Sequence, residues 1–259
     1  MPVEADAFAD LAKETVTFDA AGVALHQGIV AGRPVAWCVA GAGSPAARRA
    51  TRLLIDGHRP GLIVSAGFAG GLDAALIRGT VVYPRRAVTR AGDPPIEIAS
   101  PGQGIAIPRP TASDRGELTI VSIDTVVATA AAKKALAVAT GASLVDMETY
   151  AVAAVALAAG LPCVSIRVIS DDASQDLPRE IAALVQPQSG MRRLGTALAG
   201  IGRRPRAALD MWRLWEHAVV DGRTLAAALQ RCLAACEAHS SHQENPQPKI
   251  SRGSPGAHG

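Results

Sequence analysis

The sequence predicts an α/β fold. We expect three layers, with helices on both faces of a mostly parallel or mixed central sheet, and a helical C-terminal extension. Short apolar, β-branched runs alternate with helical patterns between residues 35 and 175, the order expected of strands joined by helices. The run 163–169 is almost wholly apolar and follows Gly160-Leu-Pro162, as expected of a strand buried on both faces. Hydrophobic residues make up 49% of the 259 residues, enough for one α/β domain with a large core or for two small ones.

The elements are predicted in chain order from hydrophobic periodicity and from Gly and Pro. The opening residues 1–11 begin as a helix, because Pro2 suits a first turn and acidic residues lie near the positive end of the helix dipole. Apolar runs predict strands at 35–39, 62–66, 81–83, 118–122, 144–147 and 163–169. Helical patterns are predicted at 46–55, 129–140 and 149–159. Residues 67–71 are predicted as a flexible glycine loop, and 94–110 as loops with short β pieces.

The C-terminal part differs in composition from the rest of the chain. After Pro178 there is no strand pattern, and residues 191–238 predict two or three arginine-bearing helices. Residues 239–259 are polar and contain Gly, Pro and Ser, which predicts a disordered tail. We therefore expect an α/β domain over 1–187, a helical extension over 188–238 packed on the same domain, and a tail over 239–259.

Charge and cysteine content exclude several classes of protein. The net charge of +3 is too small to indicate nucleic-acid binding by itself. Cys38 and Cys163 lie in apolar runs, and Cys232 and Cys236 have no second Cys/His cluster beside them, so we expect no metal site. Four such cysteines, with no signal peptide and no apolar run long enough to span a bilayer, predict a reduced cytoplasmic protein.

An acidic pair, Asp171 and Asp172, follows the buried run 163–169. In open α/β sheets ligands bind beyond the carboxyl ends of the strands. A buried carboxyl group there can hold a proton and give it to a leaving group. Taken alone, however, Asp171 is more often a helix cap or turn residue, and Asp172 a cap or solvated neighbour.

Three segments together indicate a family. They are Val64-Ser-Ala-Gly-Phe-Ala-Gly-Gly-Leu72 with Leu76-Ile-Arg-Gly-Thr-Val-Val82, then Val145-Asp-Met-Glu-Thr-Tyr-Ala-Val-Ala153, then Ile166-Arg-Val-Ile-Ser-Asp171. In this order and spacing they resemble the nucleoside phosphorylase and nucleosidase superfamily over residues 36–175. Three features resemble its hopanoid-associated phosphorylase branch: the run Ser122-Ile-Asp-Thr-Val-Val-Ala-Thr129, the segment Val145-Asp-Met-Glu148 and the arginine-bearing helical C-terminus. That branch is similar to the enzymes that split methylthioadenosine and adenosylhomocysteine.

The resemblance assigns a role to each matching residue. It implies that Asp171 protonates the purine N7 as the base leaves, that Glu148 grips the ribose hydroxyls and that Met147 packs on the sugar. Taken alone, Met147 would be assigned to the core and Glu148 to the first turn of a helix. The remaining residues implied to line the pocket are Gly67, Phe68, Gly70, Ser170 and Val126, the last giving the base an aliphatic wall where the family has an aromatic residue.

The attacking group would bind near two further segments. Gly41-Ala-Gly43 resembles the family's early glycine loop at the nucleophile site. Glu4 aligns with the glutamate that activates water in the nucleosidases, although the strand that should precede it is missing. We expect that either the true start lies upstream or the sheet lacks this strand.

Ser65 and Phe68 stand where bacterial purine phosphorylases carry an Arg and a Ser, and neither can bind phosphate as an Arg does. This favours water as the nucleophile, unless Arg48 or Arg33 replaces the missing Arg.

The resemblance therefore implies cleavage of a 5′-substituted adenosine to release adenine, with no cofactor. Phosphorolysis, with inorganic phosphate as co-substrate, is one alternative, and an inactive purine-nucleoside-binding protein is another. A homodimer is expected from the resemblance alone. A further hypothesis is that the basic C-terminus lies on an anionic membrane and reaches a lipid-linked nucleoside such as adenosylhopane. A solvated face packed on the domain or on a partner subunit is the simpler interpretation. The residues concerned are Arg192, Arg193, Arg203, Arg204, Arg206, Trp212, Arg213 and Trp215.

Overall fold

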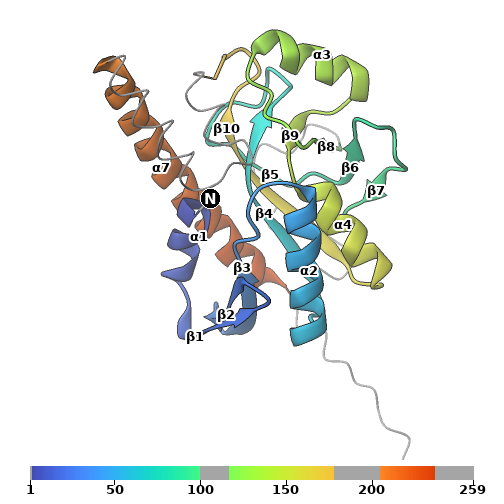
Figure 1. The fold of residues 1–259 in the computed structure, drawn as a ribbon, viewed down its shortest axis with the longest axis vertical. Coiled ribbons are helices and arrows are strands. Elements are labelled where there is room, and N and C mark those ends of the chain that lie inside the picture. The colour runs from blue at the N-terminus through green and yellow to red at the C-terminus, as the bar shows by residue number, and fades with distance from the viewer. Residues whose placement is uncertain (1, 100–116, 178–204, 237–259) are drawn as a thin grey trace, which may run out of the picture.

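A computed structural model describes residues 2–99, 117–177 and 205–236 (Figure 1). Its centre is a seven-stranded sheet in the order β5-β10-β4-β9-β8-β6-β7. The strands are β4 (Ile63–Gly71), β5 (Val81–Val82), β6 (Arg86–Thr89), β7 (Ile96–Glu97), β8 (Thr119–Ser122), β9 (Leu144–Asp146) and β10 (Cys163–Asp171). The pairs β10–β4, β8–β9 and β6–β8 are parallel, and the other three are antiparallel. The predicted α/β fold with a mixed sheet is therefore confirmed.

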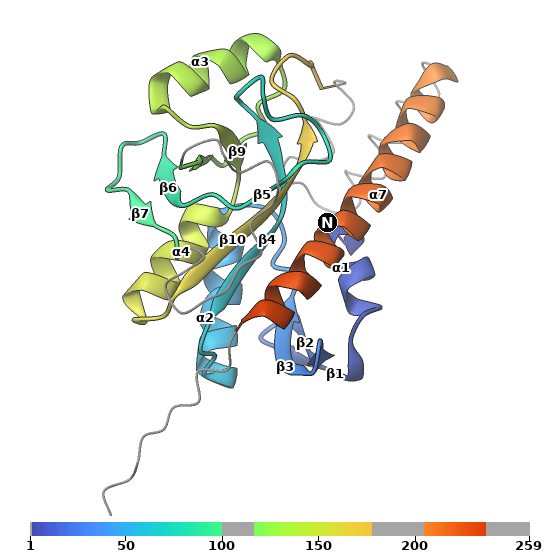
Figure 2. The ribbon, with the colours of Figure 1, turned by 180° about the vertical axis from the view of Figure 1, so that it is seen from behind.

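Helices cover both faces of this sheet (Figures 1 and 2). The bounds are α1 (Pro2–Ala9), α2 (Ser44–His58), α3 (Ala130–Thr140), α4 (Thr149–Ala158) and α7 (Pro205–Ala235). Side chains of β10 alternate between the two sides, as those of a strand must. Val164, Ile166 and Val168 pack with α7, whereas Cys163 packs with Ala153 and Ala156 of α4.

The glycine-rich stretch 67–71 continues the strand β4, so the prediction of a flexible loop there is wrong. Every residue from Ile63 to Gly70 is in register with β10, ending with Gly70 opposite Asp171. The glycines here provide space: a Cβ on Gly70 would lie 3.2 Å from Asp171 Oδ2 and 3.2 Å from Val145 Cγ1. Glycine is therefore required by the packing of two strands and a carboxylate, with no need for a turn.

A separate antiparallel sheet of three strands precedes the central one. It contains β1 (Lys13–Ala20), β2 (Val23–Val30) and β3 (Arg33–Cys38), and the sequence predicted only the last of these. The two-residue loops Ala21-Gly22 and Ala31-Gly32 have positive φ at both positions, the conformation that joins tight hairpins. Among the described residues no strand bridges the two sheets by pairing with both β3 and β4. On the edge of β4 that faces away from β10, residues 63–69 pair with no described strand.

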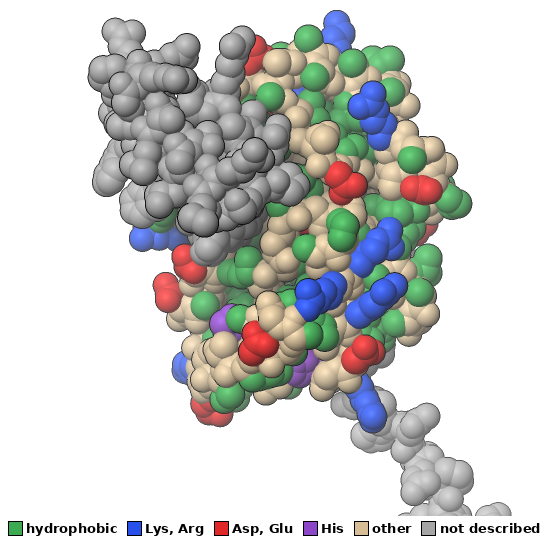
Figure 3. Space-filling model, viewed as in Figure 1, with side chains coloured by type: hydrophobic (Ala, Val, Ile, Leu, Met, Phe, Trp, Pro, Cys, Tyr) green, Lys and Arg blue, Asp and Glu red, His purple; other side chains and the backbone are tan. Residues whose placement is uncertain are grey.

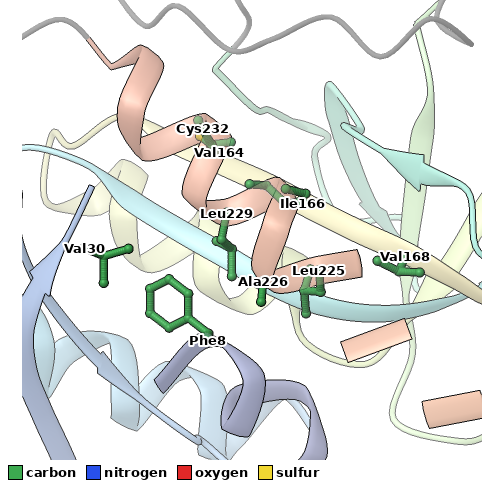
Figure 4. Packing of buried hydrophobic residues seen from close by; sticks show 10 residues of the cluster. Phe8, Val30, Val164, Ile166, Val168, Leu225, Ala226, Leu229 and Cys232 are labelled. Carbon is green, nitrogen blue, oxygen red and sulfur yellow. The ribbon is translucent and has the colours of Figure 1, made fainter. Parts of the chain in front are cut away.

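The C-terminal helix α7 is one continuous helix of 31 residues. The prediction of two or three helices covered 191–238, of which 191–204 lies outside the described residues. The apolar face of α7 explains the continuity, because Leu225, Leu229 and Cys232 recur at helical spacing and are all buried. Figure 4 shows these residues packed between β10 and Phe8 of α1. The predicted boundary at 187/188 and the tail 239–259 lie outside the described residues.

The surface and the thiols are unexceptional for an α/β protein. Figure 3 shows basic and acidic side chains interspersed on one face, with several basic ones over α2. Burial raises the pKa of Cys163 and of Cys232 to about 12, so both thiols stay protonated. Within the described ranges no helix is both long and apolar enough to cross a membrane, and no cluster of three potential metal ligands occurs.

Candidate active site

A cavity of about 2100 Å³ opens between β3, β4, α7 and the ends of β9 and β10. Almost all the residues predicted to act on a nucleoside line it. They are Gly41, Gly67, Phe68, Gly70, Val126, Met147, Glu148, Ser170 and Asp171. Of the two remaining, Gly43 contacts Glu148, and Glu4 lies in α1 with its side chain outside what the structure describes.

Asp171 ends β10 at a break in the strand register. Ile169 pairs with Ala69 and Asp171 with Gly70, so Ser170 is the extra residue of a β-bulge. Such bulges re-aim the following side chain, and they recur beside active sites. The Ser170 hydroxyl donates to Asp171 Oδ1 at 2.7 Å, and the Asp171 side chain remains 14% exposed.

Lys133 of α3 is a neighbour of Asp171 that the sequence analysis did not identify. Its Nζ lies 2.6 Å from Asp171 Oδ2, and its side chain is fully buried. It also donates to the backbone carbonyls of Asp172 at 2.5 Å and of Gln175 at 3.1 Å. A signal for it exists in the sequence, because Lys133 stands three residues before Leu136 and so shares the apolar face of this helix.

Glu148 joins the strand end to the glycine loop. It is the N-cap residue of α4, and its Oε1 accepts the N–H of Gly43 at 2.8 Å. Gly41 and Gly43 have φ of 84° and 95°, a conformation that favours glycine. The next residue, Ser44, donates its hydroxyl to Asp124 at 2.9 Å, a contact that sequence reasoning missed. The predicted loop and the predicted ribose ligand therefore lie in contact.

A buried ion pair lies directly before the segment that carries Met147 and Glu148. Arg167 Nη2 lies 2.9 Å from Asp146 Oδ2, and the side chains are 2% and 1% exposed. Arg167 also donates to the hydroxyls of Ser65 and Thr149, each at 2.7 Å. Asp146 in turn accepts the Ser122 hydroxyl at 2.6 Å. Because Asp146 directly precedes Met147 and Glu148, the pair fixes the segment that carries them.

Arg33, Arg78 and Arg167, three of the arginines that line the cavity, are bound to protein groups, and Arg59 also lines it. Arg33 donates to the carbonyl of Cys236, and Arg78 pairs with Asp221 at 3.0 Å. Arg48, the other residue considered as a phosphate ligand, is not among the cavity-lining residues. Ser65 is buried and accepts a hydrogen bond from Arg167. Phe68 packs against the core cluster that contains the buried residues of α7.

Most of the basic C-terminal residues proposed to contact a membrane lie outside the described part. Arg192, Arg193, Arg203 and Arg204 precede α7, and the structure does not describe them. Arg206, Trp212, Arg213 and Trp215 lie within α7, but their side chains are outside what is described.

Sequence comparison places the chain in a known family. The sequence model of the phosphorylase superfamily matches residues 1–201. The chain therefore belongs to the phosphorylase superfamily, as the three motifs predicted, and it is an enzyme that cleaves an N-glycosidic bond.

Solved structures share the fold. The 5′-methylthioadenosine/S-adenosylhomocysteine nucleosidase of S. pneumoniae, with a transition-state inhibitor, matches with a TM-score of 0.69 at 20% identity over 91% of this chain and 96% of that one. The corresponding nucleosidase of Neisseria meningitidis, in complex with methylthio-immucillin-A, gives 0.67 at 18%, over 90% and 95%. The futalosine hydrolase of Helicobacter pylori gives 0.66 at 18%, over 90% and 94%.

Proposed function

We propose that this enzyme hydrolyses the N-glycosidic bond of a 5′-substituted adenosine and releases adenine. The observation that carries the proposal is that Asp171, Met147 and Glu148 line a single cavity. Asp171 gives its proton to N7 of the purine, so the base leaves without accumulating negative charge. Glu148 accepts hydrogen bonds from the ribose hydroxyls and holds the sugar while C1′ moves.

The remaining residues shape the pocket around these groups. Met147 packs on the sugar, and Val126 forms an aliphatic wall for the base. Gly67 and Gly70 let the substrate approach the backbone of β4, and the nucleosidase neighbours support an adenine nucleoside as ligand. Glu4 is the proposed base for the attacking water. No cofactor is needed for this chemistry.

Water is preferred to phosphate as the nucleophile. A phosphate ion needs an Arg or several free N–H donors. The Arg167 and Arg78 guanidinium groups are paired with Asp146 and Asp221, and the N–H of Gly43 is bound to Glu148. These bonds support hydrolysis, and phosphorolysis with inorganic phosphate is the alternative that the assay below tests.

The size of the cavity supports a bulky 5′ group. Pockets for small ligands usually measure about 300–1,000 Å³, and this cavity is about 2100 Å³. Its lining combines apolar side chains, such as Trp37 and Leu233, with charged ones, such as Arg78 and Asp221. Methylthioadenosine, adenosylhomocysteine and a lipid-linked nucleoside of the adenosylhopane kind are the candidate substrates.

The deciding assay measures adenine release from methylthioadenosine, adenosylhomocysteine and adenosine, each with and without phosphate. Release without phosphate is expected, and release only with phosphate would establish a phosphorylase. Asp171→Asn is expected to slow turnover by about 10²–10⁴-fold with folding intact, and undiminished activity would remove Asp171 from its role. Thermal stabilisation by nucleosides without any base release would instead indicate a binding protein.

Two proposals concern assembly and membranes. A homodimer is expected and is tested by the mass of the protein in solution. Contact with an anionic membrane through the basic C-terminus would serve a lipid-linked substrate. Flotation with vesicles containing anionic lipid tests it, and absence of binding would exclude it.

A further inference from the structure

Lys133 is buried at a position where a lysine costs stability. Its side chain has no exposed surface, whereas Val138 of the same helix is 80% exposed. The helix α3 would bury its apolar face better with a hydrophobic residue at 133, because a buried ammonium loses its hydration. Lys133 also lies in the first helical turns, where the helix dipole disfavours a cation.

The three hydrogens of the ammonium group each have an acceptor. Two are backbone carbonyls, those of Asp172 and Gln175, which belong to the segment directly after β10. Asp176 in the same segment accepts the N–H of Ala130 at 2.7 Å, which ties this segment to the start of α3. The third acceptor is Asp171 Oδ2, at 2.6 Å. The two carbonyls thus fix the position of Nζ, and the third N–H is directed at the carboxyl group on the cavity wall.

From this geometry we propose that Lys133 is a positioning residue for the reaction, acting through Asp171. The inference rests on the proposed function, in which Asp171 protonates the leaving base. When the glycosidic bond breaks, its electron pair stays with the base and the Asp171 proton moves to the base nitrogen. The carboxylate left on Asp171 then lies against an ammonium ion already in place, with no reorganisation required. Lys133 keeps its own proton throughout.

A merely structural role for Lys133 makes a different prediction. If the lysine only holds the segment 172–177 against α3, its loss disturbs the whole site and slows every substrate alike. If it supports proton donation, its loss slows only substrates whose leaving group needs a proton. A 4-nitrophenyl β-D-riboside carries a leaving group that departs as a stable anion, so its cleavage does not depend on the acid.

The test compares Lys133→Met with Lys134→Met, a matched control. Lys134 is the adjacent lysine of the same helix and is exposed. For methylthioadenosine, Lys133→Met is expected to lower kcat by roughly 30-fold or more with KM little changed, because proton transfer is weakened rather than binding. Cleavage of the nitrophenyl riboside is expected to change little, and Lys134→Met is expected to match the unmodified enzyme on both. Lys133→Arg keeps the positive charge and is expected to retain more activity than Lys133→Met.

An equal loss on both substrates, or no loss on either, would overturn the proposal. A second measurement needs no turnover: urea unfolding of Lys133→Met, Asp171→Asn and the double variant. If Lys133 and Asp171 interact, the loss in unfolding free energy of the double variant is smaller than the sum of the two single losses. Strict additivity of the losses would contradict the interaction. Failure of the proposed function shows separately, as no base release by the unmodified chain, and the role of Lys133 in the reaction would then fall with it.

Discussion

Two ion pairs lie at positions 167 and 171 of the same strand, β10, and they differ in how their carboxylates are enclosed. In the pair Arg167–Asp146 both side chains are almost completely buried, at 2% and 1% exposed. In the pair Lys133–Asp171 the lysine is fully buried, but the aspartate is 14% exposed and lines the cavity. The first pair is enclosed by hydroxyl groups of Ser65, Ser122 and Thr149.

The difference in enclosure suits the two pairs to different roles, one structural and one in the reaction. A buried charge pair adds little stability by itself, but losing one partner leaves an uncompensated charge. Arg167–Asp146 therefore locks the strand end and the segment of Met147 and Glu148 in one arrangement. Lys133–Asp171 likewise joins a basic group to a carboxyl group, but it leaves one side of that carboxyl group open to a ligand, so Asp171 can exchange a proton with it.

The largest effect expected from this comparison is on stability. Arg167→Met keeps much of the side-chain volume and leaves Asp146 as an unpaired buried charge. We expect the free energy of unfolding to fall by about 3–5 kcal/mol. Lys133→Met should cost less, because the exposed side of Asp171 can be hydrated from the cavity. Urea unfolding of both variants measures the difference, and equal losses would show that the two carboxylates are equally enclosed.

The resemblance carried by the three motifs was sufficient to predict that Asp171, Glu148 and Gly70 line one cavity. From strand positions alone only Asp171 could be placed, beyond the carboxyl end of the run 163–169. The partners of these residues could not be predicted, since Lys133 lies on a helix outside all three motifs. Its contact with Asp171 depends on how the segment 172–177 folds back over α3. The one indication in the sequence is the position of Lys133 on the apolar face of α3.

Two further elements, β4 and β1, were not predicted correctly from the sequence. The glycines 67–71 have the composition of a loop, and only their pairing with β10 makes them a strand. Strand β1 was missed although Val16, Phe18 and Ala20 alternate with Thr17 and Asp19, the pattern typical of a strand. The strand is exposed along nearly its whole length.

A smaller effect is expected from filling the space that Gly70 leaves open. In Gly70→Ala the new Cβ would lie 3.2 Å from both Asp171 Oδ2 and Val145 Cγ1, closer than ordinary contact. The carboxyl group is displaced more easily than the strand, so we expect kcat to fall by roughly 10- to 100-fold, since small misplacements of reacting groups are costly. Adenine release measures this. Stability should fall by about 1–3 kcal/mol, and kcat equal to that of the unmodified enzyme would show that Asp171 is not held by this contact.

The smallest effect is expected at Ser170, which supports the open pair only. Its hydroxyl donates to Asp171 Oδ1 at 2.7 Å, while Oδ2 is held by Lys133. Ser170→Ala removes one neutral hydrogen bond, worth about 1 kcal/mol, so a fall in kcat of roughly fivefold is expected. Because Arg167 and Asp146 are untouched, the urea midpoint should stay close to that of the unmodified enzyme. Ser174→Ala is the matched control, since Ser174 is exposed and its hydroxyl contacts Asp172 rather than Asp171. A loss at Ser170 as large as that of Lys133→Met would mean that the hydroxyl, and not the ammonium, is the main support of the carboxyl group.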